Sequence, residues 1–526
     1  MKKLFAFLIA CASLTLAAPK PKLVLVIAVD QFRYDYLLRF RSEYKQGLDE
    51  LLTRGAVFTN AYYEHFPTVT AVGHSTFLSG ALPSISGIVG NEWYERETGK
   101  TVTSVSDDSV KILGGTGDGG ASPRRLLVST VGDELKMADG GRSRVIGMSI
   151  KDRSGILPAG HMADGAFWFD AKNGNFISST YYFSELPGWA GEFNAAHPAD
   201  RYKSATWMDQ KMPSEAGPKL YNAELDTPFA NELIEQFAEH AVAGEKLGER
   251  GATDLLAISF SANDHVGHRV GPDAPEVHDI SVKTDQVIGK LFHFLDGRVG
   301  MQNVLVVFTA DHGVAPVPEV NEARHMPGGR MAAGIVRDTV QAALAKKYGE
   351  GNWIVSPGEY AIYLNLDLIR QKNLDRAAVN QTAAEAALSI PHVGRVHTRE
   401  QLLNGTVQED RIGHRLMNGF NVKRSADLFV LLEPYWLSGA HGTTHGTPYG
   451  YDAHVPVILM GQGIRAGRFD ETIAVNDIAP TLATMLEVET PSGSSGRVLD
   501  EVFAEPPHES ARNRDAAAKT PRGAVR

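Results

Sequence analysis

Residues 22–30 read KLVLVIAVD, an unbroken apolar run that ends in an aspartate. Such a run is typical of a strand that is buried on both faces of a parallel sheet. Similar runs recur at 144–148, 254–260, 304–309 and 455–460. Helical patterns lie between and beside them, at 71–78, 282–295, 331–347 and 477–486. Strands that alternate with helices predict an α/β fold with a doubly wound, mostly parallel central sheet and helices on both faces.

This alternation is interrupted between residues 316 and 435. The stretch contains its own helical patterns and a strand-like run at 360–366, which predict an inserted cap domain. Residues 19–315 and 436–504 are then the two parts of the core. Residues 505–526 are polar and have no apolar period, so we expect a disordered tail.

The first 18 residues have the pattern of a targeting segment. Lys2 and Lys3 precede a short apolar stretch that ends in small residues, as in a secretory signal peptide. The stretch is too short, and too soon followed by Pro19, to predict a membrane span, and a retained anchor is the alternative. We therefore expect a periplasmic or secreted protein. Lipid attachment at Cys11, which ends the sequence Leu-Ile-Ala-Cys, is a further alternative.

Composition limits the function. The 526 residues are 43% hydrophobic, which excludes wholesale disorder, and carry a formal net charge of −10. A broad nucleic-acid-binding surface is not expected, because phosphate backbones are met with positive charge. Cys11 is the only cysteine, so neither an intrachain disulfide nor a cysteine-based zinc ribbon can form. Histidine is plentiful at 18 residues.

Carboxylates and imidazoles gather where the predicted strands end. In open α/β sheets the carboxyl ends of the strands line the ligand crevice. Catalytic zinc takes three protein ligands from histidine and carboxylate and keeps one position open. The residues fill two such sites, Asp264, His268 and His445 in the first, and Asp30, Asp311 and His312 in the second.

Thr70 opens the helical pattern at 71–78. A hydroxyl there would lie near backbone N–H groups that favour an anion. On position alone, however, an N-cap is the favoured interpretation of Thr70.

The ordered set of motifs resembles the alkaline phosphatase superfamily, in particular the alkaline phosphatases with a threonine nucleophile. The resemblance covers residue 24 to about residue 490 and rests on Asp30, Thr70-Ala-x-Gly-His74, Gly90-Asn91, Asp264-x-x-x-His268, Asp311-His312-Gly313 and Thr444-His445-Gly446. It implies two Zn²⁺ per chain, held by the two ligand sets above. It also implies that Thr70 is the nucleophile and a ligand of the second zinc, and that a phosphothreonine intermediate forms. Asn91 would donate to a phosphoryl oxygen.

Two other branches of the superfamily fit poorly. Sulfatases use a Cys or Ser in a C/S-x-P-x-R setting, which the sequence from Thr70 to His74 lacks. The cofactor-independent phosphoglycerate mutases use a serine and manganese. The nucleotide pyrophosphatase/phosphodiesterases share the bimetal core and remain an alternative.

Lys151 and Arg153 favour a phosphate monoester as substrate. In the threonine alkaline phosphatases, which this sequence resembles, a Lys-x-Arg pair at this place contacts the phosphoryl oxygens; a solvated charged loop is the alternative. Two zinc ions balance three aspartates and a Thr70 alkoxide, so the core is near neutral. A monoester brings a charge of roughly −2, one more than a diester, and two extra cations match it.

The sequence therefore predicts a secreted zinc-dependent alkaline phosphatase that releases phosphate from small-molecule monoesters. A nucleotide pyrophosphatase/phosphodiesterase with the same core is the first alternative. A non-catalytic, metal-binding secreted protein is the second.

Overall fold

The fold is described from a computed structural model, in which residues 20–504 are described except for 118 and 358–360. The signal peptide predicted at 1–18, with Cys11, and the tail predicted at 505–526 lie outside the described residues. Among the described helices, none combines the length and apolar character that crossing a bilayer requires.

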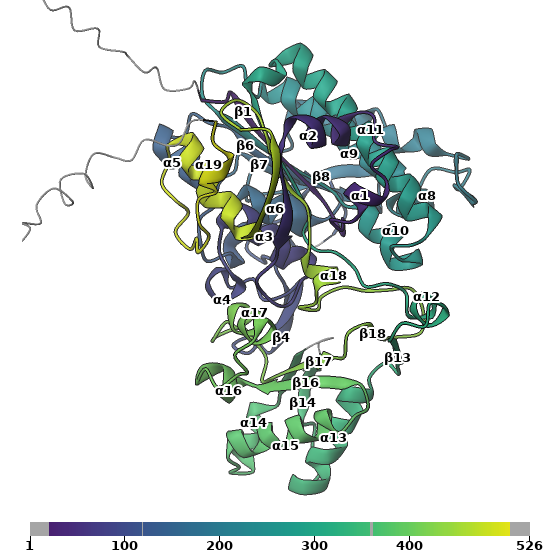
Figure 1. The fold of residues 1–526 in the computed structure, drawn as a ribbon, viewed down its shortest axis with the longest axis vertical. Coiled ribbons are helices and arrows are strands. Elements are labelled where there is room, and N and C mark those ends of the chain that lie inside the picture. Colours follow the sequence, from purple (N-terminus) through teal and green to yellow (C-terminus); the bar gives the residue numbers. More distant parts are fainter. Residues whose placement is uncertain (1–19, 118, 358–360, 505–526) are drawn as a thin grey trace, which may run out of the picture.

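A ten-stranded sheet forms the centre of the larger part of the molecule (Figure 1). Its strand order is β20-β2-β19-β12-β1-β11-β6-β7-β8-β5. The strands are β1 (Leu23–Val29), β2 (Ala56–Tyr62), β5 (Ile112–Leu113), β6 (Val145–Ser149), β7 (Gly165–Asp170), β8 (Asn175–Ser179), β11 (Asp254–Phe260), β12 (Val304–Thr309), β19 (Val457–Met460) and β20 (Gly467–Ala474). Every residue of β1, β11 and β12 is buried, which explains their unbroken apolar runs.

Most of the strand pairs are parallel, as predicted. β1 pairs in parallel with β11 and β12, β6 pairs in parallel with β11 and β7, and β2 pairs in parallel with β20. β19 runs antiparallel to both β12 and β2, and β8 runs antiparallel to β7 and β5. The sheet is therefore mixed, with a parallel centre.

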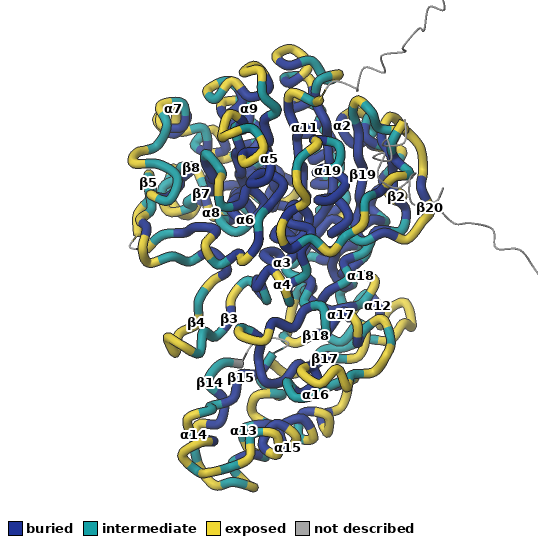
Figure 2. The backbone as a smooth tube through the Cα atoms, turned by 90° about the vertical axis from the view of Figure 1, so that its left-hand side faces the viewer, coloured by how far each residue is buried: buried dark blue, intermediate teal, exposed yellow. Residues whose placement is uncertain are grey.

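Helices cover both faces of this sheet (Figure 1). One face carries α2 (Gly47–Arg54), α9 (Pro228–Glu245) and α11 (Pro275–Arg298), which contact one another through α11. The other carries α3 (Thr70–Ser79), α5 (Val131–Asp139), α6 (Asp152–Ala159) and α19 (Ile478–Leu486). Figure 2 shows the buried backbone concentrated between these layers, with exposed segments at the periphery.

The pairing register brings several strand ends to one level. Val29 at the end of β1 pairs with Phe260 at the end of β11, and Ala28 pairs with Thr309 at the end of β12. Ser149, the last residue of β6, pairs with Ser259. The residues that follow these four strands therefore leave the sheet at the same edge.

Residues between α12 (Pro318–Ala323) and β18 (Trp436–Ser438) form a smaller four-stranded sheet, in the order β14-β15-β17-β16. Its strands are β14 (Ile354–Pro357), β15 (Ala361–Leu364), β16 (Val393–Thr398) and β17 (Leu428–Leu432), and its helices are α13 (Ile335–Tyr348), α14 (Leu366–Gln371), α15 (Arg376–Leu388), α16 (Arg399–Leu403) and α17 (Arg411–Gly419). The sheet lies below the larger one in Figure 1 and has an apolar core of its own.

The chain enters and leaves this region through two short strands, β13 (Gly329–Met331) and β18 (Trp436–Ser438), which pair in parallel. The predicted helix start at Met331 is therefore wrong. Met331 belongs to β13, and α13 begins only at Ile335, after Gly334 with φ +79°. The positive φ explains the boundary, because glycine adopts this conformation without steric cost.

The remaining elements are short or lie at the edges. They are α1 (Tyr36–Arg39), α4 (Pro83–Ser86), β3 (Glu92–Glu95), β4 (Lys100–Thr103), α7 (Gly188–Ala195), β9 (Thr206–Trp207), β10 (Gln210–Lys211), α8 (Pro218–Leu225), α10 (Ala262–Val270), α12 (Pro318–Ala323) and α18 (Gly450–Ala453).

Candidate metal centre

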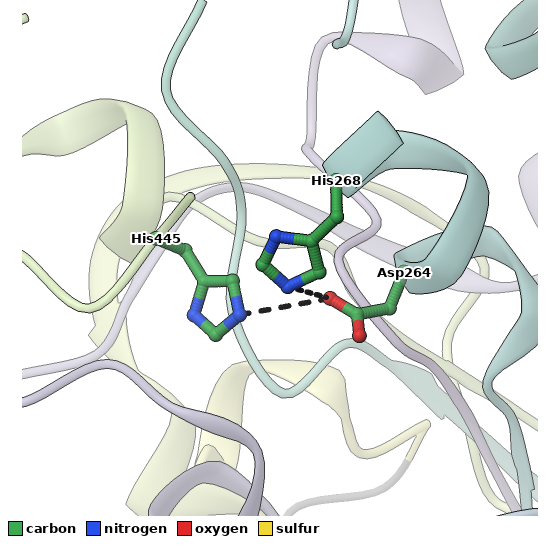
Figure 3. A group of neighbouring side chains, drawn as sticks. All are labelled: Asp264, His268 and His445. Carbon is green, nitrogen blue, oxygen red and sulfur yellow. Dashed lines mark ion pairs between the residues drawn. The ribbon is translucent and has the colours of Figure 1, made fainter. Parts of the chain in front are cut away.

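The first predicted ligand set comes together at the sheet edge where β1, β11, β12 and β6 end (Figure 3). Asp264 and His268 lie one turn apart on α10, which follows β11, and His445 lies on the loop before α18. Nε2 of His268 is 3.2 Å from Oδ1 of Asp264, and Nε2 of His445 is 3.6 Å from the same oxygen. One ligand atom from each residue lies within 4.8 Å of the other two, a spacing that one metal ion can bridge.

The second set gathers around Asp311. Asp30, His74 and Asp311 are buried and offer ligand atoms within 4.8 Å of one another. His312 adjoins them, with Nε2 3.2 Å from Oδ2 of Asp311 and 3.5 Å from Oγ1 of Thr70. All the residues of the second predicted set, including Thr70, therefore lie together. His74 was not in that predicted set.

The three predicted ligand histidines share one hydrogen-bonding arrangement. In each, Nδ1 lies 2.9 Å from a backbone carbonyl, namely His268 on Thr443, His312 on Gly313 and His445 on Thr68. A carbonyl only accepts hydrogen bonds, so Nδ1 carries the proton and donates. Nε2 then faces its cluster and is the nitrogen that, once deprotonated, can bind a metal ion, as in most histidine–metal sites.

His74 is arranged differently. Its Nδ1 lies 2.9 Å from the carbonyl of Thr70, and its Nε2 lies 3.0 Å from Oγ of Ser259. Both ring nitrogens therefore contact protein atoms, and Ser259 in turn donates to Oδ1 of Asp30. We assign His74 to the support of Thr70 and Asp30. The spacing of Thr70 and His74, four residues apart at a helix start, is the sequence signal for this contact.

The two clusters adjoin each other. The rings of His312 and His445, one from each set, stack with centroids 3.4 Å apart. Burial lowers the pKa of His445 well below its ordinary value, and His312 and His268 lower it further. His312 is also buried, but Asp311 raises its pKa to about 9. The clusters therefore share one electrostatic environment.

The donor set fits divalent metal ions. Asp30, Asp264 and Asp311 are all buried, and Lys151 donates to Asp30 and Asp264. Oδ2 of Asp311 is buried and has no hydrogen-bond partner among the described residues. Buried carboxylates are costly unless they are paired or coordinate a metal. Mixed carboxylate and imidazole ligands suit zinc and similar ions.

Lys151 spans the two clusters. It follows β6, and its Nζ lies 3.0 Å from Oδ2 of Asp30 and 2.6 Å from Oδ2 of Asp264. Its side chain is 8% exposed, which rules out a solvated loop for this residue. Burial lowers the pKa of Lys151, but Asp264 and Asp30 raise it above its ordinary value. Burial would raise the pKa of Asp264, yet Lys151 and His268 hold it well below the usual range.

Arg153 lies in the first turn of α6, two residues after Lys151. Its Nε is buried and has no hydrogen-bond partner among the described residues. Its charge is close enough to lower the pKa of Lys151. An arginine fork with an unused donor is suited to binding a phosphoryl group.

Thr70 is the first residue of α3, and Val69 is the N-cap. The N-cap interpretation of Thr70 is therefore wrong. The Thr70 side chain is buried and its Oγ1 faces His312. Gly73 allows this placement, because a Cβ there would lie 2.2 Å from the carbonyl oxygen of Asp311. The first turn of α3 thus packs directly on the backbone of a ligand residue.

The side-chain amide of Asn91 is fixed by a hydrogen bond to its oxygen. Its Oδ1 accepts the N–H of Ala71, the residue after Thr70, at 2.8 Å. With the oxygen fixed in this way, the amide nitrogen keeps its two donors for another partner. Asn91 therefore lies beside Thr70, as the predicted donor to a phosphoryl oxygen requires.

Fold and site together place the chain among the metal-binding α/β enzymes of the alkaline phosphatase superfamily. The chain belongs to the type I phosphodiesterase / nucleotide pyrophosphatase family, whose model matches residues 24–452. This family comprises phosphoesterase hydrolases.

Relatives are similar over nearly the whole chain. Alkaline phosphatase PafA of Elizabethkingia meningoseptica is 35% identical over 94% of this chain and 96% of its own length. Alkaline phosphatase PhoV of Synechococcus elongatus is 34% identical over 92% of this chain and 93% of its own length.

Solved structures agree with these relatives. The crystal structure of wild-type PafA superimposes with a TM-score of 0.87 at 35% identity, covering 93% of this chain and 100% of that chain. Murine ectonucleotide pyrophosphatase/phosphodiesterase 5 matches with a TM-score of 0.52 at 15% identity, covering 89% of this chain and 95% of that chain. The second likeness shows the fold alone.

Proposed function

We propose that the protein is a zinc-dependent alkaline phosphatase that releases inorganic phosphate from small-molecule phosphate monoesters. The observation that carries this proposal is the placement of Lys151 between the two Asp/His clusters, with Arg153 and Thr70 beside them. The relatives that are named alkaline phosphatases support it. The signal-like start at Lys2 and Lys3 supports work in the periplasm or outside the cell.

Two zinc ions per chain fit the ligand sets. Asp264, His268 and His445 would hold one ion, and Asp30, Asp311, His312 and the hydroxyl of Thr70 would hold the other. When bound, zinc supplies concentrated positive charge that favours ionisation of a neighbouring hydroxyl and stabilises the negative charge of the transition state.

The chain's own residues perform the displacement. Oγ1 of Thr70 attacks phosphorus, and the bond from phosphorus to the substrate alcohol breaks as the phosphothreonine bond forms. A water molecule then attacks the same phosphorus, and the Thr70 oxygen leaves as inorganic phosphate is released. Asn91, Lys151 and Arg153 provide donors for the phosphoryl oxygens during both steps.

The charge of the site favours a monoester. Lys151 and Arg153 add two positive charges beyond those of two metal ions, which match the charge of roughly −2 that a monoester carries at neutral and alkaline pH, one more than that of a diester. The main alternative is a nucleotide pyrophosphatase/phosphodiesterase, because the matching family model bears that description. A diester presents one fewer charged oxygen and has less use for the pair.

A side-by-side assay tests the proposal. The zinc-loaded protein is given p-nitrophenyl phosphate and bis-p-nitrophenyl phosphate under the same conditions, with Thr70→Ala as the nucleophile-free control. We expect kcat/KM to be higher for the monoester, and Thr70→Ala to lose nearly all turnover while retaining two zinc ions. Higher kcat/KM for the diester would instead assign the protein to the phosphodiesterases. Zinc binding without any turnover would indicate a non-catalytic metal-binding protein.

A further inference from the structure

Gln31 follows Asp30 at the end of β1 and contacts both clusters. Its backbone N–H donates to Oδ1 of Asp311 at 3.0 Å. Its side-chain amide donates to Oδ1 of Asp264 at 2.7 Å. We propose that Gln31 is a positioning residue that fixes one carboxylate of each metal site. The inference rests on the proposed function, since it concerns the zinc ions of that same site.

The two hydrogen bonds leave the metal-facing positions open. At Asp311, the backbone N–H holds Oδ1, while Oδ2 faces His312 at 3.2 Å. At Asp264, the amide uses Oδ1, the oxygen that also faces His268 at 3.2 Å. A carboxylate oxygen has two lone pairs, so one hydrogen bond still leaves a lone pair for a metal ion. Partners of this kind orient ligating carboxylates and contribute to metal affinity.

The backbone of Gln31 is held in an uncommon conformation. Its φ is +64°, in the left-handed region that residues other than glycine, asparagine and aspartate seldom adopt. Such conformations persist where the surroundings determine them and often occur at functional sites. Here this turn directs the N–H to Asp311 and the side chain to Asp264.

The Gln31 side chain packs against α10 at Gly267, where the absence of a side chain leaves room for it. A Cβ at Gly267 would lie 1.7 Å from Oε1 of Gln31, far inside van der Waals contact. Gly267 lies between Asp264 and His268 on the same helix. The amide of Gln31 is therefore seated against the helix that supplies two ligands of the first site.

A neutral amide suits this place. Lys151 already contributes a positive charge to Asp264 and Asp30. A second cation at Gln31 would oppose a divalent ion, whereas an amide donor orients the carboxylate without adding charge.

The test replaces Gln31 by glycine and measures zinc binding, apart from catalysis. Gln31→Gly keeps the backbone N–H to Asp311 and relieves the positive φ, but removes the donor to Asp264. In competition with a chromophoric zinc chelator, we expect one of the two zinc ions to bind about 10- to 100-fold more weakly and the other to be unchanged. Cobalt substitution should likewise change the visible absorption of one site alone.

Three variants keep the result interpretable. Lys246→Gly relieves a similar positive φ of 54° at the exposed C-cap of α9, and should leave both zinc affinities as they are. Gly267→Ala displaces the Gln31 amide from the other side and should weaken the same zinc ion. In a His268→Ala background, which lacks a ligand of the first site, Gln31→Gly should have no further effect on the remaining zinc.

Unchanged zinc affinities in Gln31→Gly, or an equal weakening of both ions, would overturn the assignment of Gln31. Failure of the unaltered protein to bind two zinc ions would instead contradict the proposed function. The two failures are distinguishable, because the first is measured as the zinc affinity of the Gln31→Gly variant and the second as the zinc content of the unaltered protein.

Discussion

At the scale of single residues, Asn91 offers a substitution that separates structure from chemistry. Asn91→Asp keeps the oxygen that accepts the Ala71 N–H, but replaces the amide donors by a negative charge. We expect kcat/KM for p-nitrophenyl phosphate to fall by about 10²- to 10³-fold, the usual cost of losing one transition-state donor, with little change in Tm. Asn91→Ala serves as control, because it removes both functions and should also lower Tm. Full activity in Asn91→Asp would contradict the proposed role.

In the proposed function, Lys151 and Arg153 carry the preference for monoesters. Replacing both by alanine should lower kcat/KM for p-nitrophenyl phosphate by about 10²- to 10³-fold and that for the diester by less than about tenfold. Lys136→Ala is a matched control. Lys136 lies on α5, away from the clusters, and is also buried and paired, with its Nζ 2.7 Å from Oδ2 of Asp164. The ratio of the two activities should not change in that control. Equal losses on both substrates in the double variant would remove the substrate argument.

The sequence could predict the residues that gather in the two clusters, but not all of the residues that support them. Each predicted ligand aspartate lies at or shortly after the end of a buried apolar run, so the sheet rule pointed to it. Gln31 also lies just after such a run, but the sequence does not show what it contacts, because its hydrogen bonds reach residues 233 and 280 positions away. Thr70 shows the converse limit, since a hydroxyl at a helix start is consistent with a cap or a nucleophile until the backbone assigns the cap to Val69.

At the scale of elements, α17 fixes two loops that carry site residues. Nη1 of Arg415 donates to the carbonyl of Pro448 at 2.6 Å, and Nη2 donates to Glu64 at 3.0 Å. Pro448 follows His445 by three residues, and Glu64 precedes Thr70 by six. The side chain of Arg415 is only 2% exposed. One arginine from the smaller sheet region therefore joins the segments that carry His445 and Thr70.

Arg415→Met should disturb the site without changing any residue in it. Methionine fills a similar volume but cannot hold either loop, so we expect kcat to fall by about tenfold or more, because small displacements of reacting groups are costly. Arg411→Met is the matched control. Arg411 also contacts Glu64 at 3.0 Å, but it is 51% exposed and has no hydrogen bond to Pro448. Its kcat should stay within about twofold, and an equal loss in both variants would show that the Glu64 ion pair alone matters.

Element prediction worked where burial makes the sequence pattern simple. β1, β11 and β12 are buried along their whole length and were found as apolar runs. β20 has mostly exposed residues, so it has no comparable run and was not predicted. The direction of β19 was not predictable either. An apolar run shows that a strand is buried, while its antiparallel direction depends on how the chain returns from the inserted residues.

At the scale of the whole molecule, the net charge of −10 gives no sign of a phosphate site. The clusters explain why, because their positive charge would come from a few buried cations and from the metal ions of the proposed function, which the sequence total does not count. The buried charged groups do, however, affect a property of the whole molecule, namely its stability against unfolding. The pH dependence of folding depends on buried groups whose pKa differs between the folded and the unfolded chain.

Glu224 on α8 is such a group. Both of its carboxyl oxygens are buried without a hydrogen-bond partner among the described residues. Burial, together with the charge of Asp200, raises its pKa from 4.5 to about 8. Because the folded pKa lies above the unfolded one, the neutral carboxyl is favoured in the fold. Its contribution to stability is fully present below about pH 4.5 and is lost as the pH rises through about 8.

Glu224→Gln should therefore stabilise the protein increasingly as the pH rises from about 4.5 to about 8. Glutamine resembles the neutral carboxyl, so urea unfolding at about pH 4, below the unfolded pKa, should give nearly equal free energies for both proteins. At pH 9 the variant should be more stable by an amount on the order of a few kcal/mol, since each unit of pKa shift corresponds to about 1.4 kcal/mol. Glu192→Gln, at an exposed position on α7, should follow the unaltered protein at both pH values. Parallel pH profiles for Glu224→Gln and the unaltered protein would show that this carboxyl does not limit stability, and that the alkaline range of the fold is set elsewhere.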